Sequence, residues 1–291
     1  MGLKRRLKLI VPWPLKIASK LIVARLPLPR AWLNRLGFFK HGYMVDLAYA
    51  RGVFAGHRAR LHGGAADGRL TVLELGLGDS LLSAVIGRAS GVERTYLVDV
   101  GRFVSDDVGL YRDAASQLGE QHFVTPPSGW TTLDDVLRGC NASYDIDGLA
   151  ALMRIPDASV DLLWSHAVLE HVLRAEFEPI MRESARVLRP GGIASHRIDL
   201  RDHLAASLHS LRFSPRVWEG RLFRGSGFYT NRLRAGEIRA ICESVGLSAE
   251  FASVQTWEEL PVPRAKMDPM FRGLSDRDLK IQGCDLVLRP A

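Results

Sequence analysis

The chain of 291 residues has little cysteine and no long uninterrupted hydrophobic run. Its three cysteines, Cys140, Cys242 and Cys284, are scattered and form no C-x-x-C pair. This spacing argues against a zinc site and a disulfide framework, so we expect three buried thiols, no metal and a reducing, cytoplasmic setting. Prolines and lysines interrupt the apolar N-terminal stretch, which excludes a membrane-spanning helix there and disfavours a secretory signal peptide.

Residues 1–45 lack acidic side chains. They contain no Asp or Glu but ten of the 39 Lys and Arg residues, so the rest of the chain is slightly acidic. A main domain of that charge is not expected to bind nucleic acid. The basic lead contains Trp13 and an imperfect amphipathic pattern over residues 15–26. Two roles stay open for it, a lid over a ligand cleft or peripheral contact with the anionic inner face of a membrane.

We therefore divide the chain into this lead, residues 1–45, and an α/β domain, residues 46–291. Apolar runs that alternate with helical segments predict strands at 70–75, 94–99, 142–146, 160–165, 192–200, 248–256 and 281–288. Such alternation favours a mostly parallel, Rossmann-like sheet with helices on both faces. Residues 119–140, 201–232 and 257–279 form insertions that this core fold does not need. The last two follow the fifth and sixth strands, where we expect substrate recognition.

The first predicted strand runs into a glycine turn, and the second ends at Asp99. The polar and glycine positions of the turn are Glu74, Gly76, Gly78 and Asp79. Glycines let the backbone approach a ligand, and an acid after the second strand binds ribose hydroxyls. A dinucleotide site would have a third glycine where Leu81 stands, which disfavours a nicotinamide oxidoreductase. Carboxylates at the turn suit the ammonium and sulfonium of S-adenosylmethionine (AdoMet), although a turn without any ligand is the plainer alternative.

A second group of motifs lies downstream. Residues 161–164 read D-L-L-W, residues 169–171 read L-E-H, and residues 183–192 read E-S-A-R-V-L-R-P-G-G. With the glycine turn, they closely resemble the class I AdoMet-dependent methyltransferases, in particular the small-molecule type 11 group. The resemblance covers about residues 70–200 and departs from the family at Ser80, where a last glycine would stand. It implies a seven-stranded sheet with an antiparallel last strand, AdoMet as cofactor and methyl transfer as activity.

The resemblance also implies where AdoMet would lie. The methionine moiety would bind at the glycine turn, the ribose at Asp99 and the adenine near residues 147–149. Ser165, at the end of the fourth strand, would face the cofactor or the acceptor. The expected cofactor-binding residues are Glu74, Gly76, Gly78, Asp79, Asp99, Asp147, Gly148, Leu149 and Ser165. Asp147 could instead be a turn or capping residue.

Methyl transfer to a hydroxyl needs a base, and histidine has a pKa near neutrality. His166 ends the fourth strand, and residues 195–203 gather histidines and aspartates at the end of the fifth. On a strand, His196 and Ile198 share one face while Arg197 and Asp199 share the other. The candidate catalytic residues are His166, His196, Asp199 and His203. The alternative for this cluster is an Arg–Asp network that holds a loop.

These patterns together predict an AdoMet-dependent methyltransferase that acts on a small or glycan-linked acceptor. The histidine and aspartate cluster favours oxygen as the methylated atom. The basic lead favours a lipid-linked glycan as acceptor, bound at the inner face of a membrane. The sequence indicates no oligomeric state. A protein of another class, which binds AdoMet or another nucleoside without catalysis as a scaffold or regulator, is the alternative. The intact acids Glu74, Asp79 and Asp99 argue against it.

Overall fold

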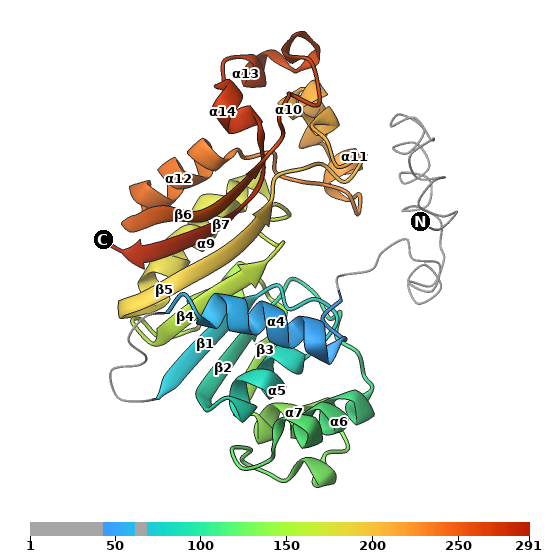
Figure 1. The fold of residues 1–291 in the computed structure, drawn as a ribbon, viewed down its shortest axis with the longest axis vertical. Coiled ribbons are helices and arrows are strands. Elements are labelled where there is room, and N and C mark those ends of the chain that lie inside the picture. The colour runs from blue at the N-terminus through green and yellow to red at the C-terminus, as the bar shows by residue number, and fades with distance from the viewer. Residues whose placement is uncertain (1–42, 62–68) are drawn as a thin grey trace.

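The computed structural model describes residues 43–61 and 69–291. Their centre is a seven-stranded sheet of order β3-β2-β1-β4-β5-β7-β6, with helices on both faces (Figure 1). The strands are β1 (Leu70–Leu75), β2 (Val92–Val98), β3 (Ala142–Asp145), β4 (Val160–His166), β5 (Leu188–Asp199), β6 (Leu247–Thr256) and β7 (Ile281–Pro290). Only β7 runs antiparallel to its neighbours, β5 and β6. The predicted Rossmann-like α/β fold is confirmed, and β1 and β4 meet at its centre, where the strand order reverses.

The helices divide between the two faces of the sheet. One hydrophobic core joins α4 (Leu47–Arg58), α5 (Leu82–Ala89), α6 (Val108–Leu118) and α7 (Leu133–Gly139) to what we call the α4 face. A second core joins α8 (Leu149–Met153), α9 (Arg174–Val187) and α12 (Ala235–Ser244) to the opposite face. Val72 and Leu73 of β1 enter different cores. Packing on both faces explains why every residue of this strand is buried and why four of its six residues are leucine or valine.

Helix α4 crosses the sheet in front of the central strands (Figure 1). Asp46 caps its start by accepting a hydrogen bond from the Tyr49 amide at 2.8 Å. Its buried residues Ala50, Phe54 and His57 recur at helical spacing, and the Phe54 ring meets that of Trp164 edge-on at 6.2 Å. This single helix therefore brings polar side chains of the chain's early part onto β4 and β5.

Helix α5 begins at Leu82, after a turn in which the Ser80 hydroxyl accepts a hydrogen bond from the Leu82 amide at 2.9 Å. The strand boundary that differs most from the predicted one is the start of β5. Strand β5 begins at Leu188, before the Pro-Gly-Gly sequence expected to precede it. Leu188 pairs with Val160, and the register then shifts, so the chain bulges through the glycines without leaving the sheet.

The insertions after β5 and β6 form short helices that lie together above the sheet (Figure 1). They are η2 (His209–Arg212), α10 (Pro215–Trp218), α11 (Arg221–Arg224), η3 (Arg264–Lys266), α13 (Pro269–Arg272) and α14 (Asp276–Leu279). The buried Arg232 guanidinium joins the two insertions, since it lies 5.3 Å from the Trp218 ring and 5.0 Å from the Phe271 ring. The third insertion, at 119–140, contains η1 (Pro127–Gly129) and α7. Among the described helices, none is both long and apolar enough to cross a bilayer.

A side chain at Gly192 would collide with the backbone of β4. A Cβ there would lie 2.9 Å from the Val160 carbonyl oxygen and 3.1 Å from that of Asp161. Because backbone atoms inside a sheet cannot move aside, we expect Gly192→Ala to lower the free energy of unfolding by about 2 kcal/mol in urea denaturation. Gly273→Ala is the control, since a Cβ there meets nothing within 4 Å, and a similar loss in both variants would contradict the explanation.

The carboxyl of Glu74 is buried beneath the glycine turn and accepts a hydrogen bond from the Ser83 hydroxyl of α5. Burial raises its pKa from 4.5 to about 8. Between these values the folded protein holds a proton that the unfolded chain has lost, so the stability that Glu74 contributes is lost as the pH rises.

We therefore expect Glu74→Gln to gain stability relative to the natural protein by on the order of 1 kcal/mol per pH unit between about pH 5 and pH 8. Urea denaturation at several pH values measures this difference. Glu243→Gln, an exposed substitution, should show no such trend. A constant difference between Glu74→Gln and the natural protein across the range would refute the buried, protonated carboxyl.

Candidate functional site

The glycine turn after β1 and the loop after β4 are packed against each other. Gly76 and Gly78 adopt φ values of +70° and +73°, which favour glycine. A Cβ at Gly76 would lie 2.5 Å from a Val168 methyl carbon, so the Val168 side chain already occupies that space. The carboxyl ends of β1 and β4 therefore form one continuous floor.

Backbone hydrogen bonds join the neighbouring loops to this floor. The Gly76 amide donates to Val98 at 2.8 Å, the Asp99 amide to Asp145 at 2.9 Å, and the Gly148 amide to the Asp99 carbonyl at 2.9 Å. Three loops that the sequence assigned to methionine, ribose and adenine thus lie side by side along the edge formed by β1, β2 and β3. This is the edge at which open α/β sheets bind ligands.

The carboxylates of this edge differ in their surroundings. Asp99 is nearly buried, and its Oδ1 accepts a hydrogen bond from the Val100 amide at 2.7 Å. Asp79 lies at the glycine turn, where its carbonyl accepts from the Ser105 amide at 2.8 Å. Asp147 is exposed and pairs with Arg154 at 2.8 Å. The negative charge nearest the turn therefore comes from Asp79 and Asp99.

Three other expected cofactor residues lie below or beside the edge. Glu74 points to Ser83, as described above, and Ser165 is fully buried with its Oγ 2.8 Å from His196 Nδ1. Both side chains are therefore buried in the protein interior and do not face the open side of the edge. Leu149 begins α8 directly after Gly148, whose φ of +56° turns the chain from the edge into the helix.

Two apolar side chains at this edge were missed by the sequence analysis. Val100 is 78% exposed and Ile146 is 44% exposed, each directly after an aspartate at the end of its strand. A Cβ at Gly148 would lie 3.2 Å from Val100, so the valine stands against the positive-φ glycine. Exposed aliphatic groups beside an acid offer a surface for a flat ring next to a ribose. The sequence does contain a signal for them, because each is the apolar residue directly after an aspartate at the end of a strand.

These features fit AdoMet. Positive-φ glycines give backbone access, Asp99 stands at the ribose position, Val100 and Ile146 offer an apolar surface for adenine, and the acids suit a cationic ligand. The observation that carries most weight is that backbone hydrogen bonds hold all of these groups on one edge.

The structure separates the four candidate catalytic residues. Residues opposite each other in β4 and β5 are Ser165 with His196, and His166 with Arg197. His196 therefore points away from the α4 face. Burial on the opposite face of the sheet lowers the pKa of His196 to about 3. His166 lies on the α4 face, with Nδ1 3.4 Å from His57 Nε2. Burial, followed by the charge of Arg197, lowers the pKa of His166, so its imidazole is neutral at pH 7.

The other two candidates hold loops. Burial opposes ionisation of Asp199, but hydrogen bonds from Arg201, at 2.8 and 2.9 Å, outweigh it and lower the pKa of Asp199. His203 stacks on His171, with ring centroids 4.9 Å apart and their Nε2 atoms 3.1 Å apart. His171 donates from Nδ1 to the Tyr229 carbonyl at 2.9 Å. This pair ties the insertion after β5 to the loop after β4.

A pocket of about 430 Å³ opens between α4 and the sheet beside His166, and we call it the α4 pocket. Its polar lining comes from α4 and the turn that follows it, and from β4, β5 and β7. Those side chains are Tyr49, His57, Arg60, His166, Arg197 and Asp285. His57 and Arg60 could not be recognised as site residues from the sequence, because nothing local connects their segment to β5.

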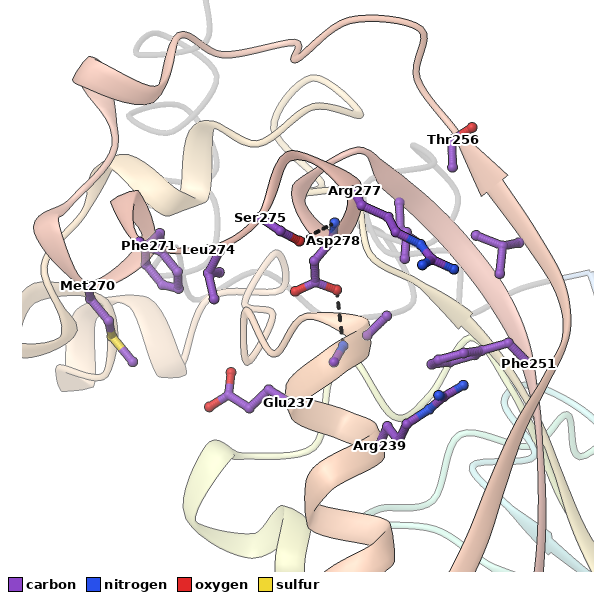
Figure 2. Close-up of a pocket in the computed structure, with 15 residues that line it drawn as sticks. Glu237, Arg239, Phe251, Thr256, Met270, Phe271, Leu274, Ser275, Arg277 and Asp278 are labelled. Carbon is purple, nitrogen blue, oxygen red and sulfur yellow. Dashed lines mark hydrogen bonds between the residues drawn. The ribbon is translucent and has the colours of Figure 1, made fainter.

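A larger pocket of about 770 Å³ lies elsewhere, between α12, the end of β6 and the α13–α14 segment. Figure 2 shows Glu237 and Arg239 of α12 on one side and Phe271 and Leu274 on another. Four strand spacings separate β6 from β1, a distance of about 19 Å. This pocket is therefore remote from the glycine turn. In residues 43–61 and 69–291, no group of three or more His, Cys, Asp or Glu side chains is arranged to hold a metal.

Comparisons with known proteins find a methyltransferase domain in part of the chain. A family model described as a methyltransferase domain matches residues 114–195, which contain β3, β4, α9 and part of β5 but not the glycine turn. A protein of Mycolicibacterium smegmatis described as "Probable S-adenosylmethionine-dependent methyltransferase/" is 34% identical over 104 residues. The alignment covers 35% of this chain and 34% of that protein, so the chain spans about a third of the length of this curated relative.

Two solved structures are similar to this chain at low sequence identity. The mitomycin 7-O-methyltransferase MmcR is 16% identical, with coverage of 97% of this chain and 69% of that chain and a TM-score of 0.47. A SAM-dependent methyltransferase of Archaeoglobus fulgidus is 11% identical, with coverage of 84% and 94% and a TM-score of 0.44. At these values neither structure speaks to the acceptor. The matched family model and the curated relative agree with the motifs, and residues 114–195 of this chain match a methyltransferase domain.

Proposed function

We propose that this protein is an AdoMet-dependent methyltransferase that acts on a small or glycan-linked acceptor at oxygen. The observation that supports this most is the hydrogen-bonded edge that joins the glycine turn and Asp99 to Gly148, since Gly148 lies in the segment that matches a methyltransferase domain. The bound cofactor supplies a methyl carbon activated by a sulfonium. Asp99 and Val100 position it, and the acids at the turn favour its positive charge over that of a phosphate-bearing nucleotide.

The acceptor hydroxyl must lose a proton as its oxygen takes the methyl group. Of the four candidates, only His166 both ends a strand at this edge and lines a pocket. Its neutral imidazole can accept that proton, and the contact of 3.4 Å with His57 orients the ring. His196 is confined to the other face of the sheet, and His203 and Asp199 hold loops. His166 is therefore the base of the proposed reaction.

A non-catalytic protein that binds AdoMet is the second candidate. Such a protein would need the sheet edge at the ends of β1, β2 and β3, which we call the cofactor edge. It would need no acceptor pocket and no neutral histidine beside that edge. The α4 pocket next to the cofactor edge therefore favours an enzyme.

Cofactor binding tests the proposal first. Titration calorimetry of the purified protein with AdoMet and S-adenosylhomocysteine should give one saturable site. Because Asp99→Ala removes a charged hydrogen-bond acceptor, we expect it to weaken binding by about 10-fold to 100-fold.

Asp106→Ala is the matched control, since Asp106 is an exposed aspartate paired with Arg102. It should bind as the natural protein does. Undiminished affinity in a folded Asp99→Ala variant would remove Asp99 from the site. No binding by the natural, folded protein would remove AdoMet from the proposed function.

We further propose that the enzyme meets a lipid-linked acceptor at an anionic membrane surface, to which it binds peripherally. The basic lead behind this expectation lies almost wholly outside the described residues. The insertion after β5 gives separate support. Val217 and Leu222 are 46% and 45% exposed on α10 and α11, beside the exposed Arg216, Arg221 and Arg224. Exposed aliphatic groups among arginines suit an anionic lipid headgroup layer.

Co-sedimentation with phosphatidylglycerol vesicles measures this contact. The triple variant Arg216→Glu, Arg221→Glu, Arg224→Glu should bind at least about tenfold more weakly, since each arginine near such a surface contributes about 1 kcal/mol. The matched control reverses Arg102, Arg138 and Arg182, which are similarly exposed on other parts of the fold. If the two triple variants bind equally, the insertion makes no specific contact with the membrane.

A further inference from the structure

The α4 pocket has one wall of small residues and one of charged residues. On α4, Gly52 and Gly56 face it, and an added Cβ at either glycine would meet no atom within 4 Å. The opposite wall carries His166, Arg197 and Asp285 from the neighbouring strands β4, β5 and β7. The pocket therefore has room for a ligand and a polar surface to recognise it.

This charged wall has more positive than negative charge. Asp285 Oδ2 lies 3.1 Å from Arg60 Nη2, and Asp285 Oδ1 lies 3.4 Å from Arg197 Nη1. The other hydrogen-bond partners of the two guanidiniums are neutral, namely Ser195 at 3.0 Å and His57 at 3.4 Å for Arg60, and Gln255 at 2.8 Å for Arg197. Two guanidiniums thus share one carboxylate, which leaves a net charge of about +1. These side chains are about a quarter exposed or less, so water screens that charge only in part.

The histidines of the pocket add no charge at neutral pH. Burial, then His166 and then Arg60, lowers the pKa of His57 to about 3. Burial and Arg197 lower the pKa of His166. The remaining polar group is Tyr49, whose ring lies edge-on to the His166 ring with the ring centroids 6.4 Å apart. An anion placed here would offset the arginines and make protonation of His166 easier.

The pocket also adjoins the cofactor edge. His166 is the last residue of β4, and Val168, two residues further, is the side chain packed on Gly76. A ligand beside His166 is therefore next to the floor on which the cofactor is expected to lie.

We propose that the α4 pocket binds the methyl acceptor, and that this acceptor bears an oxyanion, a carboxylate or a phosphate. The oxyanion lies against Arg197 and Arg60, and the hydroxyl to be methylated lies at His166. In the transfer, the acceptor oxygen forms the bond to the methyl carbon, the carbon–sulfur bond breaks with its electron pair left on sulfur, and the hydroxyl proton moves to His166. The transfer step rests on the proposed function, whereas oxyanion binding does not.

The test uses full-length protein without AdoMet. Histidines labelled with ¹³C at Cε1 are titrated by NMR in phosphate, in acetate and in chloride at equal ionic strength. The chain has nine histidines, and the His166 signal is assigned from its loss in His166→Gln. We expect phosphate to raise the His166 titration midpoint by about half a pH unit or more relative to chloride. A shift with acetate as well identifies a general oxyanion site, and a shift with phosphate alone identifies a phosphorylated acceptor.

Variants of Arg197 decide whether the pocket causes the shift. Arg197→Gln should abolish the phosphate-induced shift, and Arg197→Lys should retain most of that shift. Arg182→Gln, at an exposed position of α9, should leave the shift unchanged. AdoMet affinity should be unaltered in Arg197→Gln. Equal midpoints in all three salts, or an undiminished shift in Arg197→Gln, would overturn the proposal. Failure of the natural protein to bind AdoMet would instead overturn the proposed function and leave this measurement valid.

Discussion

Close packing between Gly76 and Val168 sets the position of the whole cleft. Parallel neighbours in a sheet end at the same edge, so the loops after β1 and β4 compete for the same space. Only a residue without a side chain, in a left-handed conformation, lets the loop after β4 come this near the turn. Backbone hydrogen bonds then add the loops after β2 and β3 to the same floor. The cofactor edge and the α4 pocket are consequently placed by backbone contacts, and side chains such as Asp99 and His166 depend on them.

Most of the sheet could be predicted from the sequence because its central strands are buried on both faces. Short segments rich in leucine and valine, such as β1, leave few other interpretations. The start of β5 was predicted too late, since Pro190-Gly191-Gly192 has the local pattern of a helix end and a turn. That pattern cannot reveal that Leu188 already pairs with Val160, a contact between segments distant in the sequence.

The site divides along the same line. The glycine turn and Asp99 were predictable because neighbouring residues fix their geometry. The alternation of His196 and Arg197 across the sheet was also predictable, but not which face carries a pocket. That is decided by α4, which brings His57 and Arg60 to β5 from more than a hundred residues away. The sequence indicated four catalytic candidates near the ends of the fourth and fifth strands, whereas strand pairing places His166 beside Arg197.

The two halves of the cleft carry opposite charge. The cofactor edge has Asp79 and Asp99 near the turn, and the α4 pocket has two arginines for one aspartate. In the proposed reaction, a cationic donor and an anionic acceptor would each be held by groups of the opposite sign and would attract one another across a partly desolvated site. Methyl transfer converts the sulfonium into a neutral thioether, so this attraction ends when the reaction is complete. The same charge pattern that assembles the reactants would thereby favour release of the products.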